Sequence, residues 1–136
     1  MSNTQYHSLN DASEHPEVRP STQSLLRRSR FSADARIEVW YAINPTFMDN
    51  GVFSPFDDKM GPTHVLLGEV DYQENWQSLY GALQGEFWSP NGEANSLIQS
   101  KGLRHTSMSV GDVLVVYHPR RSSETWMCAS TGWRQL

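Results

Sequence analysis

A polar stretch at residues 104–112 gathers the side chains best suited to chemistry, namely His105, Thr106, Ser107 and Asp112. A histidine can act as a general base, a serine or threonine hydroxyl as the nucleophile, and an aspartate can orient the histidine. That role requires two hydrogen bonds in series, and the same hydroxyl and carboxylate groups also satisfy the backbone of loops and turns. We favour the second, structural interpretation and predict no catalytic residue.

Other candidate ligands and nucleophiles are scattered along the chain. His64, Glu69, His105 and His118 could assemble a metal site, but no two of them stand at a recognised ligand spacing. Cys128 is the single cysteine and lies in an apolar run, which is typical of a buried structural thiol rather than a nucleophile. No phosphate-binding glycine motif occurs. We therefore predict no metal and no cofactor.

Arginine and tryptophan, the typical anchors of protein interfaces, recur in the second half of the chain. The predicted binding surface comprises Arg104, His105, Ser107, Arg120, Arg121, Trp126 and Trp133. A second basic group, Arg27, Arg28 and Arg30, precedes the first predicted strand. This group and the pair at 120–121 could instead clamp a strand of nucleic acid.

The charge and composition of the whole chain limit its class. Five Trp, five Tyr and five Phe among 136 residues indicate a folded core, because disordered chains are poor in aromatic residues. The net charge of −4 is a poor match to the phosphate backbone of duplex DNA. No apolar run approaches the roughly 18 residues of a membrane helix, so we expect no membrane association and a cytoplasmic protein.

The elements that must position these residues are predicted by periodicity and turn chemistry. β-Branched and aromatic runs predict strands at 37–43, 63–70, 113–118 and 125–130. Asp71 and Ser89 stand where the N-caps of two helices are expected, with Gly85 and Gly102 at the helix ends. The connection at 44–62 is long and rich in turn residues.

These elements together predict an α+β fold with one domain at residues 33–136. Its antiparallel sheet has four to five strands, of which 113–118 is central because its apolar run is continuous, and two helices pack on the sheet. Residues 1–32 show no sustained hydrophobic periodicity, so we expect a flexible polar and basic arm.

Two segments carry a family resemblance. LRHTSMSVGDV at 103–113 precedes a strand and a short tip, and CASTGW at 128–133 closes the hairpin. Together they resemble the YodL-like domain, which has a comparable H-S-L-S-V-x-D-V segment before a hairpin that ends in a Gly-aromatic step. The resemblance implies a small α+β module of bacterial plasmids and phages, and it carries over no catalytic residue. The arginine-rich arm and the Pro-Arg-Arg tip at 119–121 depart from the family pattern.

These observations favour a non-catalytic binding module of a bacterial mobile element. It would engage a host or phage protein, for example as an inhibitor of host defence. The alternative is a nucleic-acid-binding accessory protein that uses the basic arm and the hairpin tip. A third interpretation is a small hydrolase or transferase built on His105.

Overall fold

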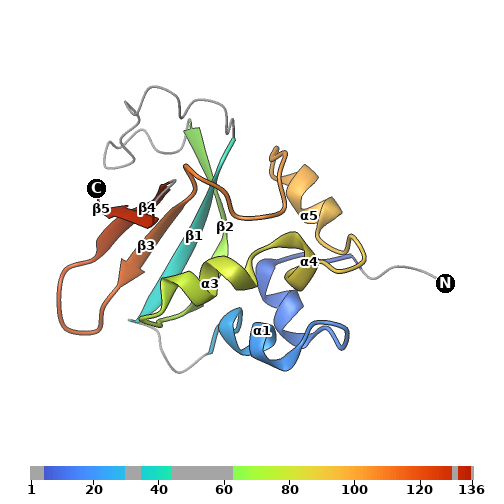
Figure 1. Ribbon diagram of the computed structural model, residues 1–136, viewed down its shortest axis with the longest axis horizontal. Helices are drawn as coiled ribbons and strands as arrows, with labels where there is room; N and C mark the ends of the chain where they lie inside the picture. The colour runs from blue at the N-terminus through green and yellow to red at the C-terminus, as the bar shows by residue number, and fades with distance from the viewer. Residues whose placement is uncertain (1–4, 30–34, 44–62, 130–131, 136) are drawn as a thin grey trace.

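The computed structural model describes residues 5–29, 35–43, 63–129 and 132–135. Its strands form one antiparallel sheet in the order β2-β1-β3-β4-β5, which confirms the predicted α+β class and the central place of β3 (Figure 1). The strands are β1 (Arg36–Ala42), β2 (His64–Asp71), β3 (Val113–Tyr117), β4 (Glu124–Ala129) and β5 (Gly132–Gln135).

The helical segments of the described residues are short and lie on one side of the sheet (Figure 1). They are η1 (Leu9–Glu14), α1 (Pro20–Leu25), α3 (Trp76–Ala82), α4 (Gly85–Trp88) and α5 (Asn95–Ser100). The two helices predicted from the sequence correspond to α3 and α5, with α4 between them. The 44–62 connection lies outside the described residues.

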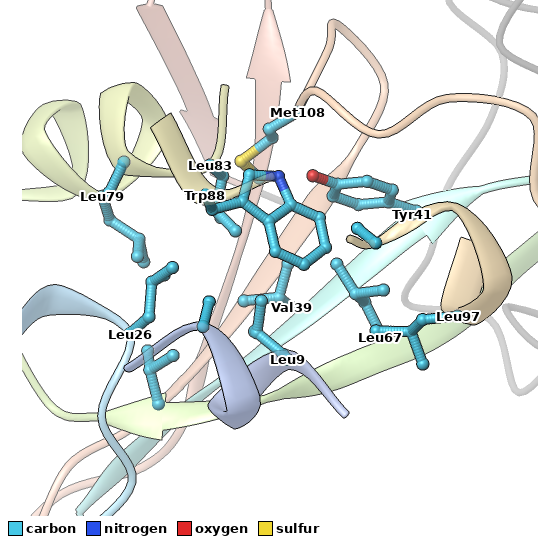
Figure 2. Close-up of a cluster of buried hydrophobic side chains, with 14 of the residues drawn as sticks. Leu9, Leu26, Val39, Tyr41, Leu67, Leu79, Leu83, Trp88, Leu97 and Met108 are labelled. Atoms are coloured by element: carbon cyan, nitrogen blue, oxygen red, sulfur yellow. The ribbon is translucent and has the colours of Figure 1, made fainter. Parts of the chain in front are cut away.

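The core lies between these helices and the facing side of the sheet (Figure 2). Strand β1 contributes alternate residues, Ile37, Val39 and Tyr41, because successive side chains of a strand point to opposite faces. Trp88 of α4 is fully buried at the centre. The hydroxyl of Tyr6 donates a hydrogen bond of 2.8 Å to the Trp88 carbonyl, so the N-terminal segment closes over this ring.

The predicted boundary between a flexible arm and the folded domain is wrong for residues 5–29. Tyr6, Leu9 and Leu26 are buried in the same core as the sheet residues. Backbone bonding fixes the segment further, because the Asp71 amide donates to the Arg27 carbonyl over 2.8 Å. Periodicity missed this segment because its few apolar residues are widely spaced. The other residues of the predicted arm lie outside the described part of the chain.

The first predicted helix begins later than Asp71. This residue ends β2, and its carboxylate accepts a hydrogen bond of 2.6 Å from the Ser29 amide rather than capping a helix. The observed cap is Asn75, whose side chain accepts a hydrogen bond of 3.0 Å from the Ser78 amide. A long-range partner has therefore replaced the local capping role that the sequence suggested.

The second predicted helix also begins later than expected. Gly85, predicted to end the first helix, instead begins a separate short helix. The Ser89 hydroxyl accepts from the Ala94 amide over 2.9 Å, so a polar turn precedes α5. This short helix is α4, and a Cβ on Gly85 would lie 3.2 Å from the Ser107 hydroxyl oxygen. Gly102 follows α5 with φ +73, the left-handed conformation predicted for that helix end.

Candidate functional site

The polar loop and the end of β1 meet at the carboxylate of Asp112, which is fully buried. One of its oxygens accepts a hydrogen bond of 2.8 Å from the Ala42 amide, and the other accepts 2.7 Å from the Ser109 amide. His105 Nε2 lies 2.9 and 3.1 Å from the two oxygens. The structure therefore brings together the histidine and the aspartate of the catalytic arrangement considered above.

The imidazole of His105 is held from its face as well as from its edge. The ring of Tyr41 stacks on it with 4.7 Å between centroids and 10° between planes. The Tyr41 hydroxyl donates 2.8 Å to the Thr106 carbonyl, and burial followed by the charge of Asp112 raises the pKa of Tyr41 well above its usual value. His105 Nδ1 is buried and makes no hydrogen bond to the described residues.

The two serine hydroxyl groups of the loop bond to backbone atoms. Ser107 Oγ accepts a hydrogen bond of 2.7 Å from the Gly85 amide, and Ser109 Oγ donates 3.0 Å to the Ser107 carbonyl. Within the described residues no hydroxyl forms a hydrogen bond with His105. The geometry therefore supports the structural interpretation of this loop, in which Asp112 and its neighbours join β1 to the turn before β3.

A second buried histidine ties β2 to the same turn. His64 is 1% exposed, and its Nε2 lies 2.7 Å from the Gly111 carbonyl oxygen. Its Nδ1 lies 3.1 Å from the Thr63 hydroxyl. Burial lowers the pKa of His64 because the charged imidazolium loses its hydration. The residues considered for a metal site are dispersed, since His118 lies at the far end of β3 from His64 and His105.

The hairpin between β3 and β4 carries an exposed basic tip at the lower left of Figure 1. Its base is packed and hydrogen-bonded, because the side chain of His118 is only 5% exposed and its Nε2 lies 3.1 Å from Glu124 Oε1. The hydrogen bond from His118 lowers the pKa of Glu124. Tyr72, which follows β2, packs edge-on against the His118 ring with centroids 5.2 Å apart.

A hollow of about 350 Å³ opens beside this base. It is lined by Tyr72, Glu74, His118, Pro119, Arg120 and Arg121. Both arginines are exposed, and neither forms an ion pair with a described residue. Within the described part of the chain, Arg121 Nη2 lies 3.4 Å from His118 Nε2. The hollow therefore combines two available guanidinium groups with an aromatic wall and a nearby carboxylate.

The predicted binding residues do not form one surface. Arg104, His105 and Ser107 precede β3, whereas the two tip arginines follow it, roughly 16 Å away along a five-residue strand. Trp126 and Trp133 are half-buried and pack on Trp76 of α3, with ring centroids 4.8 and 6.3 Å apart. These two tryptophans contribute to packing rather than projecting as anchors.

The predicted basic arm is partly committed to the protein's own acidic groups. Arg28 forms ion pairs with Glu69 at 3.5 Å and with Asp71 at 3.2 Å. Arg27 is exposed, and Arg30 lies outside the described residues. Since Asp71 adjoins Tyr72, this segment and the hairpin tip nevertheless lie at the same end of the sheet.

Sequence reasoning missed a buried polar network in the helical layer. Glu93 is 2% exposed and faces His15 Nε2 at 3.3 Å, while the Glu17 amide donates 3.2 Å to His15 Nδ1. Burial is the largest single influence and opposes ionisation of Glu93, but hydrogen bonds from Asn91 and from the Glu93 backbone, together with the charge of His15, lower its pKa. Potential ligand atoms of His15, Glu17 and Glu93 lie within 4.8 Å of one another. Because His15 Nδ1 already accepts a hydrogen bond, Nε2 carries the proton of a neutral ring, so the network fits hydrogen bonding better than metal binding. No spacing of residues in the sequence indicates this buried network.

Cys128 has the environment predicted for it. The thiol lies in β4 and is 5% exposed. Burial, followed by the charge of Asp112, raises the pKa of Cys128 to about 11. A thiol with such a pKa is almost entirely protonated at neutral pH, which disfavours a nucleophilic role.

Comparison of the chain with protein-family models, curated proteins and solved structures finds no match. The resemblance to the YodL-like domain therefore stays a prediction. No helix among the described residues is both long enough and apolar enough to cross a membrane.

Proposed function

We propose that this chain is a non-catalytic binding module of a bacterial plasmid or phage that engages a host or phage protein. In its concrete form, it inhibits a host defence protein by occupying one of its surfaces. The mobile-element context rests on the sequence resemblance alone. The binding role rests on the hairpin tip, and one observation carries it: an aromatic-walled hollow presents two exposed arginines without ion-pair partners in the described chain.

Arginine and tyrosine are enriched among the residues that dominate protein–protein binding energy. At the tip, Arg120 and Arg121 stand beside Tyr72, and the hydrogen bond between His118 and Glu124 fixes the hollow's floor. Such an arrangement reduces the ordering cost of binding, because the base is already held in one conformation. The tip therefore combines the composition and the preorganisation of a protein-binding surface.

The charges around the hollow favour a protein partner over a polyphosphate. Glu74 lines the hollow and Glu124 lies at its base, so acidic groups flank the two arginines. A phosphate backbone would bring further negative charge against both carboxylates, whereas a protein segment can vary its charge from residue to residue. The net charge of −4 on the whole chain also disfavours a polyphosphate partner.

Nucleic-acid binding is the second candidate, and a specific observation favours it. The 27–29 segment bonds to the end of β2, next to Tyr72, so the basic segment and the hairpin tip share one end of the sheet. A single strand could therefore contact both. Arg28 would contribute little to binding such a strand, because its guanidinium group already pairs with two carboxylates.

The test is affinity capture from bacterial lysate with the full chain as bait, with and without nuclease and at two salt concentrations. We expect a stoichiometric protein that survives nuclease and is lost with Arg120→Ala/Arg121→Ala. The control is Lys101→Ala/Arg134→Ala, which removes the same charge from positions outside the predicted binding surface. Recovery of nucleic acid alone, only at low salt, would establish the second candidate instead. A protein retained equally by both double variants would place the binding surface away from the tip.

A further inference from the structure

We infer that the hairpin tip recognises an acidic segment of its protein partner, with one carboxylate for each of Arg120 and Arg121. This inference rests on the proposed function and adds the chemistry of the partner. It follows from charge complementarity, because the two guanidinium groups are exposed and have no ion-pair partner among the described residues.

Two other arginines of this end, Arg28 and Arg36, show what the tip lacks. Arg28 pairs with Glu69 and Asp71, and Arg36 pairs with Glu38 and Glu69 while it stacks on the Tyr117 ring at 3.9 Å. The end of the sheet thus supplies carboxylates to these arginines from its own strands. Among the described residues, no carboxylate forms an ion pair with the tip arginines, so carboxylates of a partner can occupy this place.

The nearest internal carboxylate is already engaged. Glu124 Oε1 faces His118 Nε2 at 3.1 Å and also lies 3.4 Å from the Trp126 indole nitrogen. The charge of Arg121 contributes to the lowered pKa of Glu124, but the hydrogen bond from His118 is the larger cause. Arg121, whose Nη2 lies 3.4 Å from His118 Nε2, keeps its other N–H donors available for an external group.

A carboxylate suits these donors geometrically. The guanidinium group presents parallel N–H bonds that match the two oxygens of a carboxylate, so each pair adds orientation as well as attraction. Glu74 lines the same hollow, and its carboxylate would repel a ligand that carries many negative charges. The ligand is thus a segment with two spaced acidic residues and neutral neighbours, and the ring of Tyr72 offers a surface for an apolar side chain between them.

The experiment selects peptides from a displayed library of random 12-residue sequences on the full chain. Selected peptides are then titrated by fluorescence anisotropy against the wild type, Arg120→Ala, Arg121→Ala and the control Arg134→Ala. We expect the library to enrich paired Asp or Glu residues. Each tip substitution should weaken binding about tenfold, since a lost charge-assisted hydrogen bond has roughly that effect. Arg134→Ala should leave affinity within about twofold.

Three results would overturn the inference. The library could yield no binder, or it could yield peptides without acidic residues that bind both tip variants as tightly as the wild type. A 20-nucleotide single-stranded DNA that depends on both tip arginines and displaces the selected peptides would assign the site to nucleic acid. Affinity capture tests the proposed function separately. If a protein is captured and acidic competitor peptides do not displace it, the proposed binding module is supported and only the acidic ligand is refuted.

Discussion

Replacing Asp112 with alanine tests whether the buried polar cluster is a structural joint. The carboxylate accepts hydrogen bonds from the amides of Ala42 and Ser109, at 2.8 and 2.7 Å, and faces His105 at 2.9 Å. A buried donor that loses its acceptor costs about 1–3 kcal/mol, and Asp112→Ala removes the acceptor of two backbone amides as well as the partner of the His105 ring. We expect Asp112→Ala to lower the free energy of unfolding by about 4 kcal/mol.

The measurement is urea unfolding followed by tryptophan fluorescence, with a thermal melt by circular dichroism alongside. For a chain of this length, 4 kcal/mol corresponds to a fall in Tm of about 12 °C. Asp112→Asn keeps the shape and one carbonyl acceptor but turns an amide group toward another donor, so about half the loss is expected.

The matched control is Asp71→Ala, which removes a carboxylate whose side chain is 31% exposed and which also accepts from a backbone amide. Exposed ion pairs contribute about 0–1 kcal/mol, so this change should cost about 1 kcal/mol. The reasoning is refuted if Asp112→Ala costs no more than its control. That result would leave the cluster without a structural role and would make a functional role of His105 the interpretation to pursue.

Other predictions concern packing, pH and the N-terminal segment. Gly68→Ala should destabilise the fold by about 1–3 kcal/mol, because the added Cβ would lie 2.6 Å from the Cβ of Leu9 in η1. Gly81→Ala should stabilise helix α3 by about 0.5–1 kcal/mol, because the added Cβ would have no atom within 4 Å. Chemical denaturation of both variants measures the two effects. Because the pKa of His64 is lowered in the folded state, the unfolded chain binds the proton more readily below about pH 6.5, so unfolding free energy should fall as the pH falls from 7.5 to 5. His64→Gln should flatten that profile, and an unchanged slope would contradict the assignment. Deleting residues 5–29 should abolish cooperative unfolding, because it removes part of the core, while a flexible arm would be dispensable; a sharp, wild-type-like melt would refute this.

The strands were predictable from sequence because their signal is local. Continuous or alternating β-branched residues at 37–43 and 113–118 report burial directly, and the observed β1 and β3 match these ranges to within a residue. Gly111, in the turn before β3, takes φ +98, the left-handed conformation that favours glycine.

The helix starts were not predictable, because distant residues decide them. Asp71 and Ser89 have the residue types of caps, but the Asp71 carboxylate accepts from Ser29 far earlier in the chain, and Ser89 bonds to Ala94 beyond the usual capping distance. The candidate site was half predictable. The pairing of His105 with Asp112 follows from their nearness in sequence, whereas nothing local reveals that the Ser107 hydroxyl is taken by the α4 backbone.

The packing of the N-terminal segment has a consequence for synthesis of the chain. The Tyr6 hydroxyl meets the Trp88 carbonyl across 82 positions of sequence, and the Tyr6 amide meets the Glu93 carbonyl. During translation, these early residues leave the ribosome well before the partners that will cover them. Their apolar side chains stay uncovered over that interval, which makes them candidate contacts for chaperones on the nascent chain. Folding must then close a long loop before the core is complete, which is a slow step compared with local helix formation.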